Sequence, residues 1–147
     1  MKLSITPKKS LGQNFLVNPR ILDKIVAAAE ITKEDIVLEV GPGTGNLTKK
    51  LAEKAEKVIA IEKDRRLVPI LNQQLSANSN VEIINEDILK FNPIGSKLLA
   101  GGYKIVANIP YYITSRFLRK IFTEWPKPKL VVLTIQKEVA QRIIARP

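Results

Sequence analysis

The strongest constraint on the fold is an alternation of short apolar runs with helical patterns along most of the 147-residue chain. The apolar runs are rich in Val and Ile and are bounded by turn residues, which is typical of buried strands. They cover residues 35–40, 57–62, 81–85, 104–108 and 129–135. Strands that alternate with helices predict an α/β domain with a mostly parallel sheet and helices on both faces.

Amphipathic helical patterns fill most of the intervals between these runs. Asn18 and Pro19 have the residue types of an N-cap and a first helical position, and an apolar stripe follows them. Pro69 must lie in the first turn of its helix or kink it. Further helical patterns cover residues 46–55, 67–75, 115–125 and 137–144.

Two missing residue types narrow the chemistry that the chain can perform. The sequence contains no Cys and no His, so it has no thiolate nucleophile, no cysteine-bound zinc and no imidazole base. Catalysis must use carboxylates, amides, phenols, backbone groups or a cofactor, and we expect no metal site. No apolar run approaches the ~18 residues of a membrane span, and the first ten residues do not resemble a secretory signal. We therefore expect a cytoplasmic protein with no membrane partner.

Positive charge is concentrated near the two ends of the chain. The formal net charge is +10. Residues 1–20 contain four basic residues and no acidic one, and residues 116–147 contain eight basic residues against Glu124 and Glu138. A solvated lysine-rich surface is one interpretation. The bunching favours a polyanionic partner such as nucleic acid.

The first apolar run ends in a glycine-rich loop, EVGPGTGNLT (39–48), with Gly41, Gly43 and Gly45 at alternate positions. Alternate glycines allow close approach of a ligand to the backbone, which a simple tight turn does not require. The dinucleotide fingerprint G-x-G-x-x-G would need its third glycine where this chain has Asn46. The pattern E-x-G-x-G-x-G instead resembles motif I of S-adenosylmethionine-dependent methyltransferases, whose cofactor has no pyrophosphate.

Acidic residues follow the next two apolar runs. Glu62 lies 21 residues after Gly41, where a carboxylate can accept hydrogen bonds from both ribose hydroxyls of a nucleoside cofactor. By itself it fits a nicotinamide cofactor equally well. Asp87 can accept a hydrogen bond from an adenine amino group, or it can be a helix N-cap. Ligands of such sheets bind at the carboxyl ends of the strands, so we expect these residues in one site.

The fourth apolar run ends in N-I-P-Y, which resembles the N-P-P-Y type motif of methyltransferases that act on exocyclic amino groups. The amide oxygen of Asn108 and the carbonyl of Ile109 can accept hydrogen bonds from an adenine amino group, whose lone pair is delocalised into the ring. Pro110 fixes the local backbone, and Tyr111 can stack on an unstacked base. We predict catalytic roles for Asn108, Pro110 and Tyr111, and a buried structural role for Tyr112.

Together these motifs resemble the ribosomal RNA adenine N6,N6-dimethyltransferase family, which includes small-subunit enzymes and erythromycin-resistance methylases. The resemblance starts with KKSLGQNFLVNP (8–19) and continues through LEVGPGTGNLT, AIEKD, NEDIL, NIPYYIT and LTIQKEVAQRI. It implies two methyl transfers to the exocyclic N6 of an adenine in small-subunit (16S-type) ribosomal RNA. It also implies S-adenosylmethionine contacts from Asn14, Leu16, Gly41, Glu62, Asp87 and Asn108, to which the glycine-rich loop adds Gly43.

The family pattern extends further than this sequence does. The resemblance implies a basic N-terminal arm with a cofactor-site motif (1–20) and a Rossmann-like domain (21–147) without the family's last two strands and C-terminal helical domain. We therefore expect a truncated catalytic core with an exposed sheet edge that can promote self-association. A core that binds cofactor or RNA with little or no turnover and a ribosome-assembly role are alternatives. Asn46 and N-I-P-Y disfavour a nicotinamide-dependent oxidoreductase.

Overall fold

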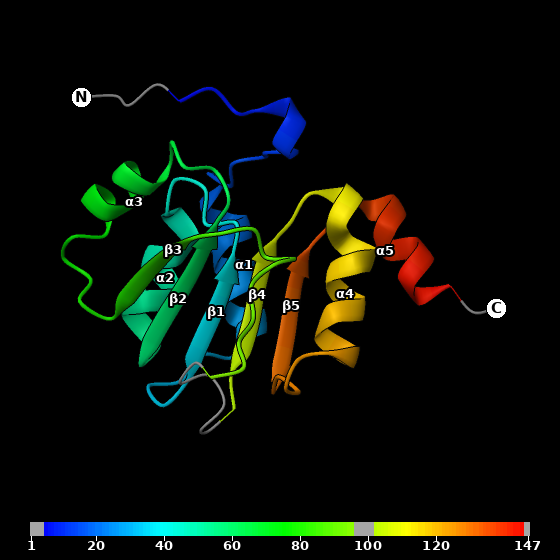
Figure 1. Cartoon of the computed structure of the whole chain (residues 1–147). Helices are drawn as coiled ribbons and strands as arrows, with labels where there is room; N and C mark the ends of the chain where they lie inside the picture. The colour runs from blue at the N-terminus through cyan, green and yellow to red at the C-terminus, as the bar shows by residue number, and fades with distance from the viewer. Residues whose placement is uncertain (1–4, 96–101, 146–147) are drawn as a thin grey trace.

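The computed structural model describes residues 5–95 and 102–145, which form one sheet with helices packed against it (Figure 1). Neighbouring strands all run parallel, in the order β3-β2-β1-β4-β5. Every predicted strand is present, with bounds within one residue of those expected. The strands are β1 (Ile36–Val40), β2 (Lys57–Glu62), β3 (Val81–Asn85), β4 (Lys104–Asn108) and β5 (Leu130–Thr134).

The helices begin where the local sequence signals predicted. Asn18 is the N-cap of the first helix, because its Oδ1 accepts a hydrogen bond from the Arg20 N–H at 3.0 Å, and Pro19 is the first helical residue. Pro69 lies in the first turn of its helix. No described helix is long and apolar enough to cross a membrane. The helices are α1 (Pro19–Ala29), α2 (Asn46–Lys54), α3 (Val68–Gln74), α4 (Thr114–Thr123) and α5 (Lys137–Ile144), with 3-10 turns η1 (Lys9–Leu11) and η3 (Tyr111–Ile113).

Both faces of the sheet are covered, as predicted. Alternate residues of a strand point to opposite faces, and in β1 Val37 packs into a cluster with α1 and α2 while Leu38 packs into a second cluster with α4. Figure 1 shows α4 on one side of the sheet and α1 and α2 on the other. Trp125, just after α4, contacts the rings of Phe91 and Phe117 edge-on in the second cluster. Each buried aliphatic side chain stabilises the fold by about 1.5–3 kcal/mol.

The strand order places a crevice beside the first strand. β1 pairs with β2 on one side and with β4 on the other. The connection after β1 leads to β2 and the connection after β4 leads to β5, so the two leave the carboxyl ends of these neighbouring strands in opposite directions. Ligands of doubly wound sheets bind at such a point. The register aligns Val40 with Ile61 and with Ala107, which brings the loops after these strands to the same edge.

A buried ion pair joins the start of β4 to the residue before β1, at the amino ends of these strands. Lys104 Nζ lies 2.9 Å from Asp35 Oδ2, and both residues are largely shielded from solvent. The same carboxylate oxygen accepts the Thr32 N–H at 2.7 Å, and Lys104 also donates to the Glu30 carbonyl. Burial pushes the pKa of Asp35 upward, but Lys104 and Thr32 more than offset this and hold the pKa below its ordinary value.

The strand β5 lies at an edge of the described sheet, as predicted. Its only pairing partner within residues 5–95 and 102–145 is β4. All five of its residues are half-buried, whereas the central residues of β4 are buried. The edge strand is therefore less covered than its neighbour.

Candidate active site

A cavity of about 300 Å³ opens at the carboxyl ends of the first four strands and is also lined by residues 11–16. Every residue for which the sequence predicted a role in binding or catalysis lines this one cavity. The fold thus brings together residues from five separate segments, while their chemical roles stay predictions. They are Asn14, Leu16, Gly41, Gly43, Glu62, Asp87, Asn108, Pro110 and Tyr111.

The glycine-rich loop brings its backbone against the ends of β2 and β4. Gly41 has a φ of +71°, and its N–H donates to the Ile61 carbonyl at 3.0 Å. A Cβ atom on Gly41 would lie 2.8 Å from the Asn108 carbonyl oxygen. Gly43 has a φ of +60°, and its N–H donates to Glu62 Oε2 at 3.2 Å. Glycine at position 41 is required both by the backbone conformation and by this close approach.

The Glu62 carboxylate is buried at the end of β2, with 6% of the residue exposed. Its Oε2 accepts the Gly43 N–H, and its Oε1 accepts the Asp64 N–H at 2.7 Å. Burial raises the pKa of Glu62, against the opposing effect of these hydrogen bonds, and the charge of Asp64 adds to the rise. Each oxygen keeps a lone pair, so ligand hydroxyls can donate here and favour the ionised form.

Asp87 caps a turn and also faces the cavity. Its Oδ1 accepts the Leu89 N–H at 2.9 Å, and its Oδ2 lies 3.3 Å from Lys63 Nζ. The interpretation of Asp87 as a helix N-cap is therefore wrong, because the residue caps a turn. Contact with an adenine amino group stays a prediction.

The N-I-P-Y motif lies next to the glycine-rich loop and presents polar and aromatic groups to the cavity. Asn108 Nδ2 donates to the Asn14 carbonyl at 3.0 Å. Within the described part of the chain, no donor is hydrogen-bonded to Asn108 Oδ1. Pro110 is extended, with φ −60° and ψ 144°, and 62% of the Tyr111 residue is exposed. The motif therefore offers the cavity a free amide oxygen on Asn108 and an exposed side chain on Tyr111.

The prediction that Tyr112 is buried is wrong, because 41% of the residue is exposed. The chain enters the 3-10 turn η3 directly after Pro110, and Ile113 instead of Tyr112 packs against the core. The two adjacent tyrosine rings meet edge-on, with centroids 5.9 Å apart. Tyr112 lies against Gly12, where a Cβ would come 3.1 Å from its ring. Its ring therefore lies beside the N-terminal segment.

Residues 5–16, which we call the N-terminal strap, cross the carboxyl end of the sheet (Figure 1). Gln13 Nε2 donates to Asp64 Oδ2 at 2.7 Å, and Asn46 Nδ2 donates to the Leu16 carbonyl at 3.1 Å. Phe15 packs against the apolar cluster of α3. Reasoning from composition found only a basic arm here, and the family resemblance alone pointed to Asn14 and Leu16.

Glu39 is a cavity residue that the sequence reasoning did not select. It is 1% exposed at the end of β1. Neither Glu39 Oε2 nor the hydroxyl of Thr48 has a hydrogen-bond partner of good geometry among the described residues. Burial raises the pKa of Glu39 to about 8, the nearby Thr48 hydroxyl opposes the shift, and the Glu62 charge adds to it. The sequence signal that could have identified Glu39 is an acidic residue inside the otherwise apolar end of the run DIVLEV.

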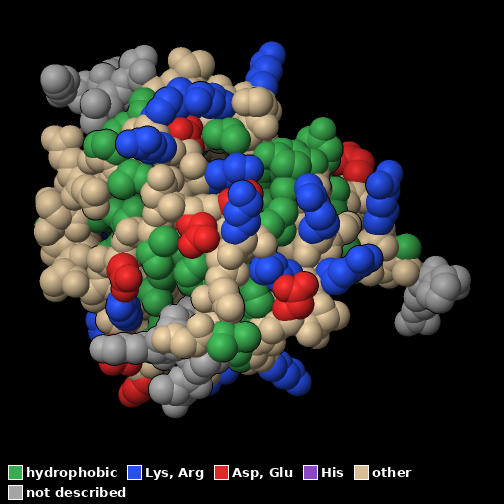
Figure 2. All heavy atoms as spheres, viewed as in Figure 1, with side chains coloured by type: hydrophobic (Ala, Val, Ile, Leu, Met, Phe, Trp, Pro, Cys, Tyr) green, Lys and Arg blue, Asp and Glu red, His purple; other side chains and the backbone are tan. Residues whose placement is uncertain are grey.

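Basic side chains are prominent on the molecular surface. Figure 2 shows Lys and Arg side chains along the upper edge and on the side where α4 and α5 lie. Exposed members of this group include Arg116, Arg119, Lys137 and Arg142. Because α4 follows the N-I-P-Y motif directly, positive charge lies close in sequence to the free Asn108 amide oxygen.

Comparison with known proteins links this cavity to one family. The family model described as ribosomal RNA adenine dimethylase matches residues 5–147. Ribosomal RNA small subunit methyltransferase A from Clostridioides difficile (strain 630) is 49% identical over 142 residues, which are 95% of this chain and 49% of that protein. Its counterpart from Alkaliphilus oremlandii (strain OhILAs) is 46% identical, with 95% and 50% covered. The chain spans about half the length of the curated relatives it matches.

Solved structures show the same likeness. A dimethyladenosine transferase from Plasmodium falciparum is 40% identical with a TM-score of 0.79, covering 90% of this chain and 47% of that one. The 23S rRNA methyltransferase ErmE is 33% identical with a TM-score of 0.76, covering 87% and 50%. The predicted Rossmann-like methyltransferase sheet is thereby confirmed.

Proposed function

The chain belongs to the ribosomal RNA adenine dimethylase family, and we propose that it is the catalytic core of an S-adenosylmethionine-dependent rRNA adenine N6,N6-dimethyltransferase. Its substrate would be an adenine of small-subunit (16S-type) ribosomal RNA, which receives two methyl groups. The observation that carries the proposal is the shared cavity. It is lined by the glycine-rich loop after β1, by Glu62 and Asp87 at the ends of β2 and β3, and by Asn108 and Tyr111 of the N-I-P-Y motif.

The residues of the cavity fit S-adenosylmethionine. Gly41 and Gly43 allow backbone to approach the ligand, and Glu62 has lone pairs free for the ribose hydroxyls. Asp87 is proposed to accept from the adenine amino group. The unpartnered buried oxygen of Glu39 suits the ammonium group of the amino-acid tail. We propose that Asn14 and Leu16 of the strap contact the cofactor from the other side.

The residues of the N-I-P-Y motif are proposed to orient the target amine. S-adenosylmethionine supplies a methyl group that is already activated by the positive charge on its sulfur. Asn108 Oδ1 and the Ile109 carbonyl accept hydrogen bonds from the adenine amino group, which favours a pyramidal nitrogen with an available lone pair. Tyr111 stacks on the base. The methylated amine releases its proton to water, so neither an imidazole nor a thiolate is needed.

Ribosomal RNA is the proposed partner, and the exposed basic residues of α4 and α5 supply its electrostatic attraction. Lys and Arg side chains neutralise backbone phosphates without reading sequence. Arg116 and Arg119 lie on α4, the helix that follows the N-I-P-Y motif, and we propose that they bind the RNA backbone. A cytoplasmic location follows from this proposed substrate.

A second candidate function follows from the length comparison. Because the chain spans about half of its curated relatives, a core that binds cofactor or RNA with little or no turnover, or that serves ribosome assembly, is the alternative. We also propose that the half-buried edge strand β5 promotes self-association. Sedimentation velocity over a range of concentrations tests this, and a single monomeric species throughout would contradict it.

The function is tested in two steps on the 147-residue chain. Calorimetric titration with S-adenosylmethionine should show saturable binding, and NADH as a control should show none. Radiolabelled methyl transfer to small ribosomal subunits that lack the modification should then show incorporation at adenine. Binding without transfer would favour the alternative function. A folded chain that does not bind S-adenosylmethionine would contradict the proposal.

A further inference from the structure

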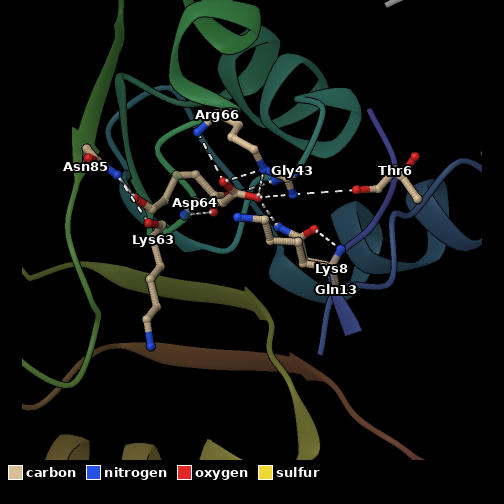
Figure 3. A network of polar contacts seen from close by, with 9 residues as sticks. Thr6, Lys8, Gln13, Gly43, Lys63, Asp64, Arg66 and Asn85 are labelled. Carbon is tan, nitrogen blue, oxygen red and sulfur yellow. Dashed lines mark hydrogen bonds and ion pairs between the residues drawn. The ribbon is translucent and has the colours of Figure 1, made fainter. Parts of the chain in front are cut away.

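The side chain of Gln13 joins the N-terminal strap to the end of β2 (Figure 3). Its Nε2 donates to Asp64 Oδ2 at 2.7 Å, and its Oε1 accepts the Lys8 N–H at 2.7 Å. Both ends of the amide are thereby engaged, so rotating or removing it breaks two hydrogen bonds. Gln13 lines the cavity but has no role in the binding and catalysis proposed above.

Asp64 is a strong acceptor for this hydrogen bond. The residue is 4% exposed, and the Arg66 guanidinium contacts its carboxylate at 2.6 Å. Arg66 holds the pKa of Asp64 well below its usual range, against the effect of burial, and Gln13 lowers it further. A hydrogen bond to an ionised acceptor is roughly twice as strong as a neutral one. The Asp64 N–H also donates to Glu62 Oε1, so the strap is tied to a residue proposed to bind the cofactor.

The next residue of the strap contacts the proposed catalytic amide. The Asn14 carbonyl lies 3.0 Å from Asn108 Nδ2. A carbonyl only accepts hydrogen bonds, so the amide group that faces it must be the NH2 end. Asn108 Oδ1 therefore does not face the Asn14 carbonyl and is left to accept from another group. The position of the strap backbone decides which end of the Asn108 amide is free.

We propose that Gln13 is a positioning residue for methyl transfer. By tying the strap to Asp64, it holds the Asn14 carbonyl in place, and that carbonyl holds the Asn108 amide with its oxygen toward the target amine. This inference rests on the proposed function, in which Asn108 Oδ1 accepts from the adenine amino group. Gln13 then helps to orient the substrate although it lies 51 positions from Asp64 in the sequence and in a different segment from Asn108.

A donor–acceptor exchange tests the proposal. Gln13→Glu places two carboxylates against each other and breaks the tie. Gln13→Glu combined with Asp64→Asn restores it with the roles reversed, because the new Asn donates to the new Glu, which still accepts from the Lys8 N–H. In that orientation the new NH2 group also faces Arg66 Nη2, which lies 2.6 Å from Asp64 Oδ2 in the wild type, so Asp64→Asn alone is measured beside the double variant to separate the loss of this contact. Circular dichroism and thermal melting confirm that these variants fold.

The first readout separates positioning from binding. In single turnovers at saturating S-adenosylmethionine, Gln13→Glu should slow methyl transfer about 10-fold or more, and the double variant should recover most of the rate. Asn46→Ala is the matched control, because it removes another amide-to-carbonyl tie of the strap, to Leu16. It should leave the saturated rate nearly unchanged. A full rate for Gln13→Glu at saturation, or no recovery in the folded double variant, would overturn the inference.

The second readout needs no methyl transfer. In the wild-type chain, NMR should show one side-chain amide proton of Asn108 protected from exchange with water by the Asn14 carbonyl. Gln13→Glu should remove that protection, the double variant should restore it, and Asn46→Ala should keep it. Protection that is unchanged in Gln13→Glu would contradict the positioning role. If this pattern is observed but the wild type transfers no methyl groups, the proposed function fails while the Gln13–Asn108 coupling stands.

Discussion

The carbonyl oxygen of Asn108 occupies the space that a side chain on Gly41 would need, because a Cβ built there would come within 2.8 Å of it. Gly41 follows β1 and Asn108 ends β4, and in these neighbouring parallel strands Val40 pairs with Ala107. The contact therefore lies where the connections of the sheet diverge. The glycine-rich loop and the proposed catalytic motif share one boundary of the cavity.

Gly41→Ala should destabilise the chain more than Gly95→Ala. Both glycines have positive φ, +71° and +90°, but a Cβ on Gly95 would meet no atom of residues 5–95 and 102–145 within 4 Å. Gly95→Ala should cost only the strain of a left-handed alanine, about 1–2 kcal/mol. Gly41→Ala should add the displacement of a backbone oxygen. Urea unfolding of both variants measures the difference, and equal losses would show that the space beside Asn108 is not restrictive.

Asn108→Ala should reduce methyl transfer by about 100-fold or more, because the variant lacks the acceptor that orients the target amine. Cofactor affinity should fall only slightly, through the lost bond to the Asn14 carbonyl. Asn85→Ala is a matched control, since Asn85 ends β3 and its Nδ2 donates to the Glu62 carbonyl at 2.8 Å. Single-turnover assays should show a small effect for Asn85→Ala. Comparable losses in the two variants would argue against a specific role for Asn108.

Glu62→Gln should weaken S-adenosylmethionine binding by about 1–3 kcal/mol. The two carboxylate oxygens accept N–H groups from Gly43 and Asp64, so one of these donors would face the new NH2 group. The charge-assisted bonds to the ribose would also be lost. Calorimetry on this variant and on Glu82→Gln, an exposed carboxylate paired with Lys57, measures the effect. An unchanged dissociation constant for Glu62→Gln would place the ribose elsewhere.

Glu39 should make the chain less stable as pH rises from about 4.5 to about 8. Its pKa is raised to about 8 in the fold from an ordinary value of 4.5, so across this window the folded state holds a proton that the unfolded state has lost. The free energy of unfolding then falls by up to about 1.4 kcal/mol per pH unit. Glu39→Gln should remove this slope. Urea unfolding between pH 5 and 8.5 compares the two, and parallel profiles would contradict the shift.

Lys104→Met should lower the free energy of unfolding by about 3 kcal/mol near neutral pH, because it leaves the Asp35 carboxylate buried without its cation. Lys50→Met, which breaks the exposed pair with Asp23, should have little effect. The loss in Lys104→Met should shrink at acidic pH, where protonation removes the unpaired charge of Asp35. Denaturant titrations at pH 7 and pH 4 check both points. A loss equal to that of Lys50→Met would contradict the importance of burial.

The sheet could be predicted from sequence because its signals are local. A strand that is buried on both faces appears in the sequence as an apolar run, as in residues 57–62. A strand-to-helix loop that lies close to a ligand contains glycines, which are also visible in the sequence. The carboxyl ends of parallel strands meet at one edge, so Glu62, Asp87 and Asn108 could be placed together without coordinates. The cavity contains all three.

The strap could not be predicted in the same way. Its contacts join Gln13 to Asp64 and Asn14 to Asn108, which are 51 and 94 positions apart, and no periodic pattern marks such pairs. The strap also explains why the prediction for Tyr112 was wrong, because the ring of Tyr112 lies against Gly12 of the strap. A tyrosine that is half-covered by a distant segment has the same local sequence as one buried in the core.

The strap also has a consequence for biosynthesis. Gln13 and Asn14 leave the ribosome long before Asp64 and Asn108, the residues that hold them. A nascent chain that ends after β3 already contains the glycine-rich loop and Glu62, yet β1 still lacks β4 as its neighbour and the cavity lacks a wall. Domains fold as units during synthesis. Binding of the methyl donor by a nascent chain would therefore indicate that β4 has paired with β1.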